Sequence, residues 1–262
     1  MDYLHAVILG LVQGVAEFLP ISSSGHLVIA DAVLREYGGM SAPKENATME
    51  ISLHFGTLLS ILVVYRRDLL NLLSDRRLML MICIATVPVG VVGLLLKSYV
   101  DAAFTKPILA GCALLVTAMV LLLGRHLQKP GRPLSEMTFG SAVLIGLFQA
   151  VAIIPGISRS GSTIAAGMVS GLDRENAARF SFLIAIPAIG GASLVQMKDF
   201  VTGEESLSGS PWPLLLGTSV AFVVGIVALR WLIRLLAADR LHVFAIYCVI
   251  VGGLTVAWQL SR

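Results

Sequence analysis

Long apolar stretches alternate with short polar segments along most of this chain. Six stretches are long enough for a helix to cross a bilayer, which takes roughly 17–25 residues. These predicted spans lie at 47–65, 78–97, 107–124, 176–197, 213–236 and 241–260. The pattern predicts an all-α integral membrane protein.

Two further apolar regions, 1–36 and 138–172, are each interrupted near the middle by small and polar residues. The interruptions are Pro-Ile-Ser-Ser-Ser-Gly at 20–25 and Pro-Gly-Ile-Ser-Arg-Ser-Gly at 155–161. A continuous helix facing lipid would not tolerate them, because broken helices at membrane depth survive only where they are buried in protein or line a cavity. Both regions are therefore predicted to be re-entrant helical hairpins.

The two interruptions belong to an internal repeat. Residues 10–25, GLVQGVAEFLPISSSG, align without gaps with residues 146–161, GLFQAVAIIPGISRSG, and nine of sixteen positions are identical. Three predicted spans separate the copies, so the second copy enters the membrane from the opposite side, as in inverted-topology repeats. We expect one membrane domain, 1–262, made of two inverted halves, 1–125 and 138–262. Each half would be a re-entrant hairpin followed by three transmembrane helices.

Composition excludes most other classes of protein. Hydrophobic residues make up 56% of the chain and charged residues 13%, about half the usual share in soluble domains. The mean hydropathy is +0.87. A net charge of +3 without any basic run argues against a nucleic-acid partner.

The charged residues are distributed unevenly among the predicted loops. Arg and Lys predominate at 66–77, 125–137 and 230–240, whereas 198–210 is mainly acidic. By the positive-inside rule, the first three loops face the cytoplasm and the fourth faces outside. Both termini are then expected outside.

The second arm of each predicted hairpin begins at its Ser/Gly turn, so two helix N-termini are expected to point into one cavity. Exposed backbone N–H groups and the positive end of a helix dipole bind anions. Hydroxyl groups add further donors, and phosphate is the anion that fits best. The residues predicted to bind substrate phosphate are Gln13, Ser22, Ser24, Gly25, Ser158, Ser160, Gly161 and Thr163.

The differences between the copies indicate chemistry rather than simple binding. Three polar residues of the first copy are replaced by different residues in the second. Glu17, Ser23 and His26 correspond to Ile153, Arg159 and Ser162. One half therefore offers a carboxylate, a hydroxyl and an imidazole, and the other offers a fixed cation. An anion conduit would not need the acid, whereas a hydrolase needs both sets.

Glu17 and Arg159 each have a functional and a structural interpretation. Glu17 shares a helix face with Gln13 and lies at membrane depth, where an ionisable residue is functional by default. The alternative is a carboxylate that reaches the membrane interface. Arg159 beside a helix N-terminus is typical of a bidentate phosphate clamp, and a structural ion pair with Glu17 is its alternative.

Ser23 precedes His26 by three residues. If Ser23 begins the second arm, the imidazole lies one turn along and can serve as the base for an attacking hydroxyl. The alternative is that Ser22 or Ser23 only caps the helix.

The segments 13–26 and 155–163 resemble the two signatures of the bacterial undecaprenyl-diphosphate phosphatases linked to bacitracin resistance. The likeness extends over essentially the whole chain and includes Ala-Arg-Phe-Ser-Phe-Leu at 178–183. It implies hydrolysis of undecaprenyl diphosphate to the monophosphate, which recycles the peptidoglycan lipid carrier. It also implies a multi-pass protein of the bacterial inner membrane, with its active site open to the outer face.

Further expectations follow from this resemblance. Glu17, Ser23, His26 and Arg159 match the catalytic positions of the family, and a divalent cation, Mg²⁺ or Ca²⁺, is implied as cofactor. Glu17 is the candidate metal ligand. Many members have a second Glu where this chain has Gln13, and an amide binds cations more weakly than a carboxylate.

Several alternatives remain open from the sequence. The nucleophile is either Ser23 or a water activated by Glu17 or His26. A transporter or flippase of polyprenyl phosphate lipids is the alternative function, because inverted repeats with broken helices are a transporter layout. A homodimer is left open as a further partner.

Overall fold

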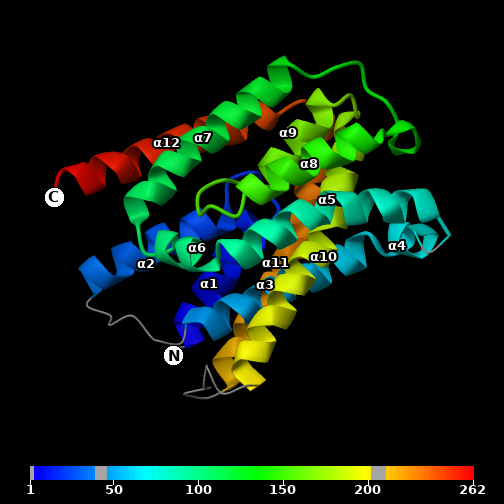
Figure 1. Cartoon of the computed structure of the whole chain (residues 1–262). Coiled ribbons are helices and arrows are strands. Elements are labelled where there is room, and N and C mark those ends of the chain that lie inside the picture. The colour runs from blue at the N-terminus through cyan, green and yellow to red at the C-terminus, as the bar shows by residue number, and fades with distance from the viewer. Residues whose placement is uncertain (1–2, 39–45, 73, 202–210) are drawn as a thin grey trace.

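The regular elements of this protein are helices, as Figure 1 shows for the computed structural model. The structure describes residues 3–38, 46–72, 74–201 and 211–262. The helices in chain order are α1 (Tyr3–Ala16), α2 (Ser23–Gly38), α3 (Asn46–Val64), α4 (Arg66–Leu72), α5 (Arg76–Leu95), α6 (Lys97–Ala103), α7 (Pro107–His126), the short 3-10 helix η1 (Leu134–Glu136), α8 (Phe139–Val151), α9 (Arg159–Val169), α10 (Arg174–Val201), α11 (Pro211–Ala237) and α12 (Leu241–Leu260).

Five of the described helices are long and apolar enough to cross a membrane: α5, α7, α10, α11 and α12. They coincide with five of the six predicted spans, so the prediction of an all-α, multi-pass membrane protein is confirmed. The predicted span 47–65 coincides with α3. Its described apolar part, Ile51–Val64, is shorter than a bilayer crossing needs, and this sixth crossing stays a prediction.

The structure also places both chain breaks where the sequence predicts them. Helix α1 ends at Ala16 and α2 begins at Ser23, while α8 ends at Val151 and α9 begins at Arg159. Each break is thus a short turn between two short helices. Buried side chains of the main apolar core, such as Phe18 of the first break and Phe182 of α10, pack around them.

Equivalent glycines of the two repeat copies make equivalent contacts. A Cβ atom on Gly10 of α1 would lie 2.6 Å from the Gly217 carbonyl oxygen of α11. A Cβ atom on Gly146 of α8 would lie 2.8 Å from the Ala85 carbonyl oxygen of α5. Both hairpins therefore bring a first arm backbone-to-backbone against a long helix, the packing that small residues allow in membranes. The two inverted halves, 1–125 and 138–262, stay a prediction.

Two long helices lie side by side along one edge of the molecule, α7 and the C-terminal α12 (Figure 1). Gly111 of α7 faces Thr255 of α12, and Gly252 of α12 lies against the Gly111 carbonyl group. Reciprocal small residues again allow this close approach.

Asp239, in the turn between α11 and α12, joins three helix ends. It accepts hydrogen bonds of 3.3 Å from Nε and Nη2 of Arg125, and it pairs at 3.0 Å with Arg174. The hydrogen bonds from Arg125 and the positive charge of Arg174 lower the pKa of Asp239 from its ordinary value of 3.8. This cluster ties the end of α7 to the start of α10.

The glycine contacts generate a first prediction. In Gly146→Ala the new methyl group meets the backbone of α5, so we expect a loss of about 1–3 kcal/mol in stability. Thermal unfolding in detergent measures it. Gly90→Ala in α5 is the matched control, because no atom from elsewhere in the described residues lies within 4 Å of its Cβ position; it should be neutral or stabilise by about 0.5–1 kcal/mol. Equal melting temperatures for the two variants would contradict the packing argument.

Asp239→Asn tests the helix-end cluster. Asparagine tolerates the left-handed backbone found here, φ 55°, but lacks the charge. Because the folded-state pKa is lowered, the carboxylate stabilises the protein above pH 3.8, and this contribution is lost as the pH falls through the folded pKa. We expect the variant to be less stable by under about 1 kcal/mol at neutral pH. Thermal unfolding should show this difference shrinking in acid; a pH-independent difference would exclude the charge as its cause.

Candidate active site

Ser22 joins the two chain breaks. Its hydroxyl oxygen accepts hydrogen bonds from the amide of Gly25 at 3.3 Å and from the amide of Gly156 at 3.2 Å, and it lies 3.4 Å from the Ile157 carbonyl oxygen. Ser22 has a left-handed backbone, φ 69°. Such a conformation costs a non-glycine residue free energy and persists where surrounding contacts impose it. The two breaks predicted to meet are therefore in direct contact.

Glycine makes this approach possible. A Cβ atom on Gly25 would lie 2.7 Å from the Gly156 Cα atom, and Gly156 itself has φ 99°. Thr117 of α7 completes the junction, because its hydroxyl group donates to the Gly156 carbonyl oxygen at 2.8 Å and accepts from the Ser158 amide at 2.9 Å. Thr117 could not be predicted from the sequence, because it is a single hydroxyl residue inside an apolar span.

Ser22, predicted to bind phosphate, is bonded to protein groups in this structure. A hydroxyl group has one proton to donate and two lone pairs to accept with. Protein groups use both lone pairs of Ser22, and the Ile157 carbonyl or the Ser24 hydroxyl is in reach of its proton. The side chain is also buried. Its observed contacts are structural.

Three predicted hydroxyl groups of the second break are also bonded to protein groups. Ser158 caps α9 by accepting from the Gly161 amide at 3.1 Å. Ser160 donates to the Leu19 carbonyl oxygen, and Thr163 bonds to the Ser181 hydroxyl at 2.6 Å. All three are buried and help to hold the two breaks and α10 together; their binding of phosphate stays a prediction.

The predicted glycines Gly25 and Gly161 are likewise packing positions. A Cβ atom on Gly161 would lie 3.1 Å from Pro20 Cβ of the first break. Ser24 differs from the other hydroxyl residues in being only half-buried, with its hydroxyl 3.3 Å from that of Ser22.

Glu17 is the centre of the polar cluster. Its Oε2 atom accepts from Gln13 Nε2 at 3.0 Å and from Ser23 Oγ at 2.7 Å, and its Oε1 atom pairs with Arg159 Nη2 at 2.5 Å. The carboxylate is buried, with 7% of the residue exposed. Its charge is thus held by the second break, and the alternative of a side chain reaching the membrane interface is wrong.

His54 of α3 also belongs to this cluster, although it is not among the site residues predicted from the sequence. Its Nε2 atom lies 3.6 Å from Glu17 Oε2. It sits alone in an apolar span, and only the packing of α3 against the first break brings it to the carboxylate. No sequence pattern links the two residues.

His26 does not contact Ser23. Its Nδ1 atom lies 2.8 Å from the Ser22 carbonyl oxygen, and its Nε2 atom lies 2.8 Å from the hydroxyl group of Tyr247 in α12. The expected hydrogen bond between imidazole and Ser23 is therefore absent here, although α2 does begin at Ser23. The hydroxyl of Ser23 faces the Glu17 carboxylate instead.

Several polar groups at the junction are left for a ligand. Arg159 Nη1 and Gln13 Oε1 are buried and have no hydrogen-bond partner within the described residues. The amides of Ser23 and Ser24 open α2, where the first N–H groups of a helix lack partners inside the helix. A buried donor without a partner is costly, so Arg159 Nη1 points to an absent acceptor.

The segment 178–183 supports the site from α10. Phe182 contacts Phe18, the residue after Glu17, with ring centroids 5.8 Å apart. It also stacks on Tyr65, and Arg179 forms an ion pair with Asp68. This segment therefore braces the first break without reaching the polar cluster.

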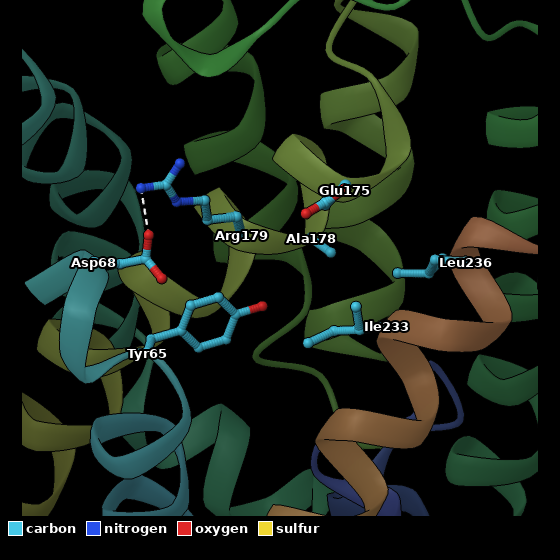
Figure 2. A pocket seen from close by; sticks show the side chains of 7 residues that line it. All are labelled: Tyr65, Asp68, Glu175, Ala178, Arg179, Ile233 and Leu236. Carbon is cyan, nitrogen blue, oxygen red and sulfur yellow. Dashed lines mark ion pairs between the residues drawn. The ribbon is translucent and has the colours of Figure 1, made fainter.

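A pocket of about 150 Å³ lies on the far side of this support (Figure 2). Figure 2 shows the Asp68–Arg179 pair on one wall and Ile233 with Leu236 on the other. The residues predicted for catalysis or phosphate binding do not line it. The pocket is separate from the Glu17 cluster.

The donor set at Glu17 suits a metal ion only in part. Among the described residues, no three His, Cys, Asp or Glu side chains are grouped to enclose a metal. Glu17 and the unpaired Oε1 atom of Gln13 supply oxygen ligands. Mg²⁺ commonly takes one or two protein carboxylates and completes its shell with water and substrate phosphates, so these residues fit that kind of site.

The arrangement suits phosphoryl transfer. A serine hydroxyl donates to a carboxylate, which can accept its proton during attack. A guanidinium group with one nitrogen unpaired lies beside them, together with helix N-termini. Such fixed donors stabilise the charge that develops on phosphate oxygens.

Comparison with known proteins shows the family of this chain. The chain is 49% identical over 261 residues to an undecaprenyl-diphosphatase of Rhodopirellula baltica, covering 99% of each protein. It is 42% identical to the protein of that name in Desulfosudis oleivorans, covering 97% of this chain and 98% of the relative. A family model described as bacitracin resistance protein BacA matches residues 6–254. The chain therefore belongs to the BacA bacitracin resistance family.

Proposed function

We propose that this protein hydrolyses undecaprenyl diphosphate to undecaprenyl phosphate and inorganic phosphate, and so recycles the lipid carrier of cell-wall synthesis. The relatives reported above are named for this activity. The observation that carries the proposal is the line from Ser23 through Glu17 to Arg159, which unites the two breaks. The transporter alternative is not favoured, because no comparable relative is named for transport among those reported.

Ser23 is the nucleophile in this proposal. Its Oγ atom attacks the terminal phosphorus while its proton passes to Glu17 Oε2, 2.7 Å away. The bond from that phosphorus to the bridging oxygen breaks, and the lipid monophosphate leaves. Water then cleaves the phosphoserine, which releases inorganic phosphate and restores the hydroxyl group. His26 is not in contact with Ser23. We therefore propose that His26 accepts a proton from the water of the second step or donates one to the leaving oxygen.

Arg159 holds the phosphate group being transferred. Nη2 keeps the guanidinium on Glu17, and Nη1 is a buried donor with no partner within the described residues. A terminal phosphate oxygen is the acceptor that Nη1 lacks. The amides at the start of α2 add donors from the other side. Ser22, Ser158 and Ser160 contribute indirectly, because they fix the two breaks.

A divalent cation would be held by Glu17 and Gln13 together with the diphosphate oxygens. When bound, such an ion neutralises phosphate charge during transfer. In this chain Gln13 replaces a carboxylate by an amide, which weakens the protein's share of the ion's binding.

The distribution of Arg and Lys supports a location and an orientation. We assign the protein to the bacterial plasma membrane, with the loops at 66–77, 125–137 and 230–240 in the cytoplasm. The site is then proposed to open toward the outer face, where spent carrier lipid is released. A polyprenyl diphosphate lipid is the proposed partner, and a homodimer stays an open option.

Phosphate release by purified protein tests this function. With farnesyl or undecaprenyl diphosphate in detergent, we expect wild type to release phosphate and Ser23→Ala to lose at least about 10²-fold in kcat. Loss of the hydroxyl removes the nucleophile, while Glu17, its hydrogen-bond partner, keeps Arg159 and Gln13.

The matched control is Ser219→Ala in α11, an exposed serine whose hydroxyl bonds to its own helix at Leu215. It should keep wild-type turnover. Wild-type protein that releases no phosphate would refute the function. An active wild type with a fully active Ser23→Ala variant would refute the covalent route and favour attack by water.

Gln13→Glu tests the metal arrangement. A second carboxylate beside Glu17 should bind Mg²⁺ more tightly than the amide does, so the Mg²⁺ concentration for half-maximal phosphate release should fall several-fold. Mg²⁺ should also raise the melting temperature of the variant more than that of wild type. An unchanged Mg²⁺ dependence in both measurements would exclude position 13 from the ion's site.

A further inference from the structure

Tyr247 and His26 form a close pair across the molecule. The Tyr247 hydroxyl lies 2.8 Å from His26 Nε2, and the two rings stack with centroids 5.5 Å apart and an interplanar angle of 13°. Tyr247 belongs to α12, 221 residues further along the chain. The imidazole is therefore fixed both by ring contact and by hydrogen bonding.

The other ring nitrogen of His26 determines which nitrogen is basic. Nδ1 lies 2.8 Å from the Ser22 carbonyl oxygen. A carbonyl oxygen only accepts hydrogen bonds, so Nδ1 carries a proton in this contact. In the neutral imidazole the lone pair is then on Nε2, and the Tyr247 hydroxyl donates to it.

A phenol suits a histidine that changes its charge. When the imidazole is neutral, the Tyr247 hydroxyl donates to Nε2; when the imidazole is protonated, the same oxygen accepts from Nε2–H. Rotation of one hydrogen atom is enough for the change. A carbonyl or carboxylate partner would favour the protonated form alone.

We propose that Tyr247 relays protons in the reaction together with His26, because its hydroxyl group can pass a proton between His26 Nε2 and the reacting water or leaving oxygen. This inference rests on the proposed phosphatase function. In the transfer, Tyr247 Oη takes a proton from the attacking water as its own proton moves to Nε2, and the reverse transfer delivers the proton to a leaving phosphate oxygen. Tyr247 ends each cycle as the neutral phenol.

If Tyr247 had only a structural role, the expected effect of removing its hydroxyl group would be different. An aromatic residue in a membrane helix also needs a partner for its hydroxyl group, and the His26 contact would satisfy that need. In that case, removal of the hydroxyl changes stability and leaves the catalytic step as it was. Kinetics separate the two roles.

The experiment compares Tyr247→Phe with wild type in phosphate release from farnesyl diphosphate. Phenylalanine keeps the ring against the imidazole and removes only the hydroxyl. We expect kcat to fall about tenfold or more with KM little changed, because the loss acts on the chemical step and not on lipid binding. Tyr99→Phe, at an exposed tyrosine of α6, is the matched control and should keep wild-type kinetics.

A double-mutant cycle with His26→Ala gives the second measurement. If Tyr247 acts through His26, adding Tyr247→Phe to His26→Ala should cause no further loss of kcat, so that the two effects are not additive. If the phenylalanine variant is poorly folded, the same cycle is measured with Tyr247→Leu. Its packing defect is then present both with and without His26, so the difference between the two losses still reports the coupling.

The outcomes are distinct. Wild-type protein without phosphate release overturns the proposed function and this inference with it. Active wild type with unchanged kcat in Tyr247→Phe, or with equal losses in the presence and absence of His26, overturns the role of Tyr247 and leaves the phosphatase intact.

Discussion

The ion pair between Glu17 and Arg159 is the interaction on which the site depends. A carboxylate buried in an apolar surrounding is costly unless it is paired and hydrogen-bonded. Here the carboxylate lies in one chain break and its cation in the other, so neither hairpin can bury its charged residue alone. The two breaks stabilise each other, and the result is a polar centre with Arg159 Nη1 and Gln13 Oε1 still unpaired within the described residues.

Neutral contacts fix the geometry of this centre. Ser22 ties Gly25 to Gly156, and Thr117 ties the second break to α7. These bonds satisfy backbone groups that an interrupted helix would otherwise leave bare in the membrane. The hydroxyl-rich sequence thus serves two purposes. Most of its serines hold the breaks, and Ser23 alone among them bonds to the Glu17 carboxylate.

Divergence of the two copies explains why a symmetrical layout supports an asymmetrical reaction. The equivalent serines Ser22 and Ser158 keep equivalent bonds, each accepting from the glycine amide three residues on. The residues that directly follow them differ: Ser23 follows Ser22 and Arg159 follows Ser158. Both of these residues contact Glu17. Shared framework bonds and altered side chains thus place a hydroxyl group from one copy and a cation from the other beside the same carboxylate.

The class of fold and the positions of the chain breaks could be predicted from the sequence, which also singled out Glu17, Ser23 and Arg159, because these follow from local patterns. Apolar length predicts a spanning helix wherever it occurs, and a repeat is visible in the letters themselves. The contacts between residues far apart in the chain could be seen only in the tertiary structure. It turned Ser22, Ser158, Ser160 and Thr163 inward, directed His26 to Tyr247 instead of Ser23, and brought His54 to Glu17. Each of these contacts is set by how separate helices pack, and side chains on an apolar span carry no sequence signal of the neighbour that packing will give them.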